Sequence, residues 1–151
     1  MAEAWTHDHN PSMTTSDHHE MGVALIAAGG SQLVEAASLL TLSLFADLDE
    51  VKPSEVREMA VSGEDENQLL EAWLRRLMDV CQNEDFLISR VRVGNRGPHS
   101  IAGEAWGEKI DPSRHRLHRS PGTVVLQEAR VVQHKDAFRA RLAFDMPRET
   151  P

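Results

Sequence analysis

The first third of the chain contains no lysine and no arginine. Residues 1–51 hold eight acidic side chains and no basic ones, which accounts for the whole formal net charge of -8; the remaining residues balance at sixteen of each sign. A protein whose main task is to grip a phosphate backbone needs a positively charged surface, so this distribution argues against such a task. It favours binding of a cation or docking on a basic partner, and ordinary solubilising charge explains it equally well.

Cysteine and long hydrophobic runs are also scarce. The single cysteine, Cys81, cannot form a disulfide within the chain, so we expect a reducing compartment. The first apolar run, residues 21–28, is short, contains Gly22 and follows no positive charge, which is not typical of a secretory signal. No run approaches the roughly 20 apolar residues that a membrane helix needs. The sequence therefore predicts a cytoplasmic protein with no membrane contact.

Motifs of common catalytic sites are missing as well. The chain has no Gly-x-Ser-x-Gly turn to carry a nucleophilic serine and no Gly-x-x-x-x-Gly-Lys loop to bind nucleotide phosphates. Cys81 continues the apolar face of a predicted helix after Leu77, so we interpret it as a core residue and not as a nucleophile. No sequence motif therefore supports acyl transfer or nucleotide hydrolysis.

Hydrophobic periodicity predicts a sheet with two helices. Strands are expected at residues 21–28 and 55–62, one helix is expected from an N-cap at Ser31 to about residue 47, and a second begins near residue 64. Beyond residue 86 the period changes to two, which predicts two hairpins that turn at residues 95–98 and 133–136. This order of elements indicates an α+β protein with a mixed or antiparallel sheet of about six strands and two helices.

The length and composition indicate one domain. A chain of 151 residues, 40% of them hydrophobic, is long enough to bury one independent core. We expect this domain at residues 17–146, between a flexible His-rich tail at 1–16 and a short tail at 147–151. The second helix should bury a stripe that includes Trp73, which we expect in the core and not in a ligand site. The stripe consists of Leu69, Leu70, Trp73, Leu74, Leu77 and Met78.

Residue types that bind metals collect near the amino terminus. Four of the eight histidines lie within the first nineteen residues, beside carboxylates, and imidazole suits zinc, nickel or copper. His7 and His9 fall in the expected tail, where no formed site is expected. His18 and Glu20 enter the first strand and share one of its faces.

The densest group of polar residues lies at 105–117, with the sequence Ala-Trp-Gly-Glu-Lys-Ile-Asp-Pro-Ser-Arg-His-Arg-Leu. Asp111 followed by proline forces a turn, and Arg114, His115 and Arg116 come next. We expect these three side chains to be exposed and mobile, because a cationic triplet has no apolar role. The segment then presents charge to a partner; the alternative is an ordinary solvated surface loop.

This loop resembles the signature loop of the archease family, small proteins that activate an RNA ligase in tRNA splicing and RNA repair. Two further segments carry the same resemblance in the family's order: residues 63–77, which begin Gly-Glu-Asp before an amphipathic helix, and residues 140–146, Ala-Arg-Leu-Ala-Phe-Asp-Met. The resemblance implies an activator that is not itself an enzyme. It contacts an RNA ligase through Asp111, Arg114, His115 and Arg116, and RNA only indirectly.

The resemblance also implies a site for a divalent cation. Archeases typically carry His-Thr-Ala-Asp, an apolar residue and Gly at the first strand, and this Asp joins an Asp near the C-terminus to hold the ion. Here Glu20 stands in place of the Asp and Asp17 in place of the His, whereas Asp145 matches unchanged. We expect Glu20, Asp145, Met146 and Asp17 to form the site for Ca²⁺, Mg²⁺ or Mn²⁺, with Glu20 and Asp145 in reach of one ion. Adaptable Ca²⁺ tolerates the longer glutamate better than Mg²⁺ does.

A second departure from the family pattern follows the loop. Archeases usually show Lys-Ala-Val-Thr, an apolar or aromatic residue and then His, whereas this chain has Gly122 and Gln127 at the Lys and His positions. The chain is therefore either a divergent activator or a binding module that kept the fold and serves a partner unrelated to RNA ligation. A third alternative, which no compact motif such as His-Glu-x-x-His supports, is a metal-dependent hydrolase. Its ligands would be His18, Glu20, Asp145 and Asp17.

Overall fold

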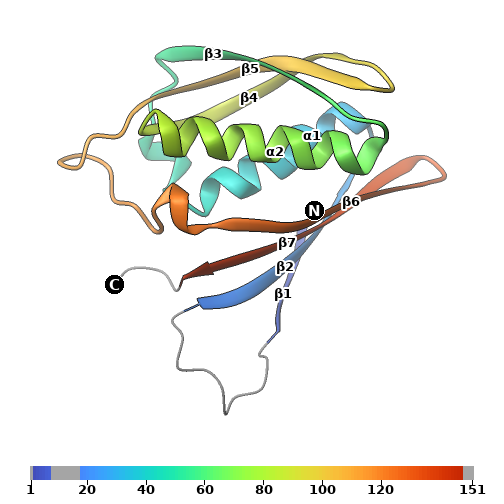
Figure 1. The fold of residues 1–151 in the computed structure, drawn as a ribbon, viewed down its shortest axis with the longest axis horizontal. Coiled ribbons are helices and arrows are strands. Elements are labelled where there is room, and N and C mark those ends of the chain that lie inside the picture. Colours follow the sequence, from blue (N-terminus) through green and yellow to red (C-terminus); the bar gives the residue numbers. More distant parts are fainter. Residues whose placement is uncertain (1, 8–17, 148–151) are drawn as a thin grey trace.

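Two helices lie in a middle layer between two antiparallel sheets (Figure 1). The structure is a computed structural model that describes residues 2–7 and 18–147. The helices are α1 (Gly30–Ser43) and α2 (Glu66–Asn83). The α+β class predicted from the sequence is confirmed. All pairings between the described strands are antiparallel, and they form two sheets where the sequence had suggested one.

The larger sheet brings together strands from both ends of the chain. Its four strands, in spatial order, are β1 (Ala2–His7), β2 (His18–Ala27), β7 (Ala137–Pro147) and β6 (Val125–His134). The expectation of a flexible tail did not anticipate β1, which pairs along its whole length with β2. On β7, buried and outward-facing side chains alternate as predicted, so only one face of this sheet packs on the helices.

The smaller sheet covers the opposite side of the helices. Its strands, in spatial order, are β3 (Glu55–Ser62), β5 (Ser100–Lys109) and β4 (Phe86–Arg96). Strands β4 and β5 form the first predicted hairpin, and β6 and β7 form the second. A bulge between Ile88 and Arg90 shifts the alternation expected for β4 by one residue, so that the buried set passes from Phe86 and Ile88 to Val91. Opposite this bulge, a Cβ atom on Gly107 would lie 1.8 Å from the Leu87 carbonyl oxygen, so this close approach requires glycine.

Helix α1 starts and ends earlier in the chain than predicted. Its N-cap is Gly29, whose carbonyl accepts from the Leu33 N–H (3.0 Å), and not Ser31. At the other end the N–H groups of Leu44 and Phe45 bond to carbonyls three residues back, which tightens the last turn and ends the helix at Ser43. The apolar residues 44–46 suggested a longer helix, but they are buried in the turn that follows it. A short 3-10 helix, η2 (Leu48–Glu50), leads on to β3.

Helix α2 supplies the centre of the core. Its predicted stripe is buried throughout, and Trp73 and Cys81 are fully covered, as expected. The indole N–H of Trp73 donates to Ser38 Oγ on α1 (2.9 Å), and this hydroxyl donates to the Val34 carbonyl (2.6 Å). The polar atoms between the helices are therefore satisfied without water. Neither described helix is long and apolar enough to cross a membrane.

The bond between Trp73 and Ser38 should contribute measurably to stability. Ser38→Ala leaves the buried indole N–H without an acceptor, so we expect the free energy of unfolding to fall by about 1–3 kcal/mol. The matched control is Ser43→Ala in the same helix, where an exposed hydroxyl bonds to the Leu40 carbonyl and the loss should stay below about 0.5 kcal/mol. Urea unfolding followed by circular dichroism measures both, and equal losses would show that the buried bond adds nothing.

Candidate functional site

Glu20 and Asp145 are direct partners across two neighbouring strands. Glu20 lies in β2 and Asp145 in β7, and the antiparallel register sets them opposite each other. Side chains in such a pair leave the sheet on the same face, with Cβ atoms about 4.5–5.5 Å apart. The structure thus brings together two carboxylates from opposite ends of the chain. Their role as cation ligands remains a prediction.

The surroundings of this pair fit a hard divalent cation. Both carboxylates are partly exposed and supply the oxygen ligands that Ca²⁺ and Mg²⁺ prefer. The side chain of Met146 points into the core and is 1% exposed, so only its backbone carbonyl oxygen is available as a ligand.

Other metal ligands expected from the sequence are less well supported. Asp17 lies outside the described residues, as does His9. The backbone of His18 pairs with Pro147, beside the carboxylate pair. Within the part of the chain that the structure describes, no three His, Cys, Asp or Glu side chains are grouped so that they could hold a metal. A cation at Glu20 and Asp145 would therefore need carbonyl or water oxygens as well.

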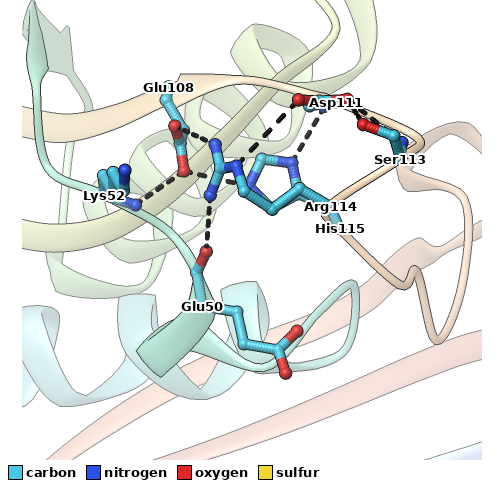
Figure 2. Close-up of polar contacts among 7 residues, drawn as sticks. All are labelled: Glu50, Lys52, Glu108, Asp111, Ser113, Arg114 and His115. Atoms are coloured by element: carbon cyan, nitrogen blue, oxygen red, sulfur yellow. Dashed lines mark hydrogen bonds and ion pairs between the residues drawn. The ribbon is translucent and has the colours of Figure 1, made fainter.

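The polar loop at residues 105–117 is built around Glu108, near the end of β5 (Figure 2). The Glu108 carboxylate is buried and accepts hydrogen bonds from the Lys52 N–H (2.7 Å), from His115 Nε2 (2.9 Å) and from the Arg114 guanidinium. Arg114 also donates to the Glu50 carbonyl (3.3 Å). One carboxylate thus ties the loop to the segment that joins η2 to β3.

His115 links this carboxylate to the turn at Asp111. Its Nδ1 accepts from the Asp111 N–H (2.9 Å) and therefore carries no proton, so Nε2 carries the proton donated to Glu108. The Asp111 carboxylate accepts from the N–H (3.0 Å) and the hydroxyl (2.7 Å) of Ser113, and these bonds lower the pKa of Asp111. The turn predicted after Asp111 is formed, and its polar groups are largely satisfied within the loop.

The prediction that Arg114, His115 and Arg116 are all exposed and mobile is wrong in part. His115 is 5% exposed, and the Arg114 guanidinium is bonded to Glu108 and Glu50. Only Arg116 is exposed without a bond to the described residues. The physical reason is Glu108, whose charge offers these groups a buried partner. This role of Glu108 was not predicted from the sequence, although its position six and seven residues before Arg114 and His115, across a turn, was a usable signal.

The charge of Glu108 is strongly favoured. The Arg114 guanidinium, with smaller contributions from the Lys52 N–H and His115, lowers the pKa of Glu108 to about 2, although burial acts in the opposite direction. The same ion pair raises the pKa of Arg114. The loop is therefore held by charge-assisted hydrogen bonds, which are stronger than neutral ones.

The end of the loop reaches the strand that carries Asp145. The backbone N–H of His118 donates to the Phe45 carbonyl (2.7 Å), and the ring Nε2 of His118 lies 2.8 Å from a carboxylate oxygen of Asp47. Arg119 then donates to the Pro147 carbonyl (2.9 Å), two residues beyond Asp145. The loop and the carboxylate pair therefore belong to one connected region.

The two positions that depart from the family pattern lie in this same region. Gly122 is exposed in the 3-10 helix η3 (Pro121–Thr123), directly before β6. Gln127 is exposed at a bulge of β6, and Val125, two residues earlier, is the register partner of Asp145. A Cβ atom on Gly122 would lie 3.0 Å from the side-chain nitrogen of Gln82 on α2, whereas Gln127 follows Val125 on the strand beside Asp145.

Comparisons with known proteins agree along most of the chain. The family model described as Archease protein family (MTH1598/TM1083) matches residues 15–146. Protein archease of Methanopyrus kandleri is 31% identical over 117 residues, which cover 76% of this chain and 83% of that protein. Protein archease of Sulfurisphaera tokodaii is 29% identical over 97 residues, 64% of this chain and 70% of that protein. The solution structure of protein 1598 of Methanobacterium thermoautotrophicum shares the fold, with a TM-score of 0.66 at 18% identity over 96% of this chain and 98% of that one.

The pKa of Glu108 predicts how stability changes with pH. Because folding lowers this pKa from about 4.3 to about 2, the stabilisation is complete above pH 5 and is lost as the pH falls toward 2. Glu108→Gln should lower the free energy of unfolding by about 3 kcal/mol at pH 7, and the deficit should shrink steadily below pH 4.5.

The control for this experiment is Glu104→Gln, in the same strand. Glu104 makes only a long ion pair with the exposed Arg92 (3.6 Å), so its loss should cost less than about 1 kcal/mol. Urea unfolding of both variants at several pH values between 7 and 3 provides the measurement. A deficit for Glu108→Gln that does not change over this range would contradict the assigned role of the carboxylate charge.

Proposed function

The chain belongs to the archease family, and from this membership we propose that it activates an RNA ligase in tRNA splicing or RNA repair and is not itself an enzyme. The family supports the coarser statement of a protein activator in RNA processing. The observation that carries the finer proposal is the register pair of Glu20 and Asp145, which matches the family's two carboxylates in place and in chemical type. The proposed place of action is the cytoplasm.

Three groups of this chain would hold the cation. The carboxylates of Glu20 and Asp145 and the carbonyl oxygen of Met146 all lie at the adjoining ends of β2 and β7. Bound there, a divalent cation supplies positive charge that assists metal-dependent nucleotidylation of the ligase's own active-site residue. Glu20 reaches further than an aspartate would, so the site suits Ca²⁺, which accepts variable geometry, better than Mg²⁺.

The loop fixes the backbone position of one exposed, positively charged side chain. Internal hydrogen bonds of Glu108, His115 and Asp111 hold the backbone of the loop. The Arg114 guanidinium is engaged in its ion pair with Glu108. Arg116 follows directly and is free to meet an acidic surface of the ligase. A group held in place before binding loses less conformational freedom on association. RNA is contacted only through the ligase.

A second candidate function is a binding module on the same scaffold, with a partner unrelated to RNA ligation. The observation that favours it is the identity of Gly122 and Gln127, which stand where the family usually has lysine and histidine. If those groups are needed to engage an RNA ligase, this chain has changed its partner. A hydrolase is not proposed, because no group of three suitable ligands occurs among the described side chains.

The activator proposal predicts an effect only in the presence of a ligase. A substoichiometric amount of the chain should restore multiple turnover to the RNA ligase encoded in the same genome. Asp145→Ala should abolish this effect and weaken Ca²⁺ binding in calorimetry, while the protein still folds, because the Asp145 side chain is partly exposed and lies outside the core.

The control for this variant is Asp136→Ala, which removes an exposed carboxylate at the turn between β6 and β7 and should change neither property. No stimulation by a folded, Ca²⁺-binding protein would reject the activator proposal and favour the binding module. Normal stimulation by Asp145→Ala would reject the cation site alone.

The two arginines of the loop should behave differently. Arg116→Glu should leave the free energy of unfolding within about 0.5 kcal/mol of the original but slow association with the ligase, because the side chain is exposed and unbonded. Arg114→Glu should instead destabilise the fold by several kcal/mol, since it places a second carboxylate against buried Glu108. Thermal unfolding and stopped-flow association measure the two effects, and equal stability losses would show that Arg116 is structural.

A further inference from the structure

Side chains of the helices cover two of the sheet edges. At the free edge of β4, the Val93 N–H donates to the Glu35 carboxylate of α1 (2.8 Å). At the free edge of β6, the Val131 N–H donates to the Asn67 side chain of α2 (2.6 Å). Groups covered in this way cannot pair with a strand of another chain.

The edge formed by β3 is not covered in this way. β3 has eight residues and pairs with β5 on one side only. Among the described residues, the one side-chain bond to its backbone is made by its own Arg57, which donates to the Val56 carbonyl (3.2 Å). The other outward N–H and carbonyl groups of this edge are therefore available, and such an edge is a template for an added strand.

A shallow hollow on the outer face of the sheet adjoins this edge. Its volume is about 500 Å³, and its floor includes the small residues Ala60 and Ala102, which are register partners. Glu58 and Glu104, also register partners, form part of its rim. Glu104 forms an ion pair with Arg92 at 3.6 Å. Of the two carboxylates, Glu58 is therefore the one whose negative charge can attract a basic group at the edge.

Two apolar side chains lie beside the hollow on the outer face of the sheet. Val56 is 47% exposed and lies opposite Trp106, whose ring carries the Arg90 guanidinium at 5.0 Å from its centroid. Along the edge, the outer face of β3 therefore presents an apolar side chain at Val56, a carboxylate at Glu58 and open space over Ala60. Side chains on one face of a strand repeat about every 7 Å, so one extended segment can meet all three.

We propose that β3 binds an extended segment of a different protein, which adds to the smaller sheet as a fourth strand. Hydrogen bonds to the edge backbone hold the segment, and its outward side chains supply the specificity. The residue opposite Glu58 is lysine or arginine. The residues two positions before and after it are apolar, one against Val56 and one in the hollow over Ala60.

A second copy of this chain fits the edge poorly. If two β3 strands pair antiparallel with their outer faces aligned, the registers of greatest overlap place the two Glu58 side chains directly opposite or diagonally adjacent. Like charges in these positions are unfavourable. This edge belongs to the sheet that does not carry Glu20 and Asp145, so the proposal does not depend on the activator function.

Synthetic peptides test the proposal directly. The probe is a blocked heptapeptide, Thr-Leu-Thr-Arg-Thr-Leu-Thr, whose symmetry makes it independent of strand direction. One comparison peptide has Glu in place of Arg, and another has all backbone N–H groups methylated. Titration of the ¹⁵N-labelled full chain should shift the amide signals of residues 55–62 and the indole signal of Trp106 with the first peptide, and much less with the others.

Two variants and a control decide the result. Glu58→Lys should weaken binding of the Arg peptide about fivefold and reverse the preference toward the Glu peptide. Val56→Ser removes the apolar contact without a change of charge and should weaken binding of both peptides. Asp79→Lys makes the same charge change at an exposed site on α2 and should have no effect. Shifts elsewhere, equal binding of the methylated peptide, or a concentration-dependent dimer through residues 55–62 would overturn the proposal.

Discussion

The pairing of β2 with β7 is the constraint on which the candidate site and the core both depend. Ten register pairs join the two strands. Because side chains alternate across a sheet, the same register sends Leu142, Phe144 and Met146 into the core and sets Asp145 opposite Glu20 on the outer face. A slip by one residue would expose the apolar set and separate the carboxylates. The energy of core burial therefore also fixes the two carboxylates opposite each other on the outer face.

The second fixed point is the carboxylate of Glu108. It converts a segment that is polar in sequence into a loop with a defined backbone, because Arg114 and His115 find a buried partner. Arg119 extends the connection to the end of β7. The loop and the carboxylate pair are thus held at fixed positions relative to each other before any partner binds. Such rigidity suits a protein that acts by positioning charge for another protein.

Local periodicity predicted most of the fold, and long-range contacts explain what it missed. The stripe of α2 around Trp73 follows from a period of 3.6, and the hairpin that ends in β7 follows from a period of two. The division into two sheets depends on helices buried from both sides, which no local pattern shows. The burial of His115 depends on the Lys52 N–H and on Glu108, across a gap of 56 residues between them. The opposition of Glu20 and Asp145 was anticipated from the family pattern and not from any periodicity.

Two departures from the family pattern, Glu20 and Gln127, are far apart in the linear sequence but lie on the two strands that flank β7. Glu20 is opposite Asp145, Val125 is the register partner of Asp145 on its other side, and Gln127 lies two residues further along β6. Gly122 precedes the same strand. None of these positions belongs to the buried core, so core packing does not fix which residues stand there. The scaffold of β2, β6 and β7 can therefore be kept while the residues at this end of the sheet change.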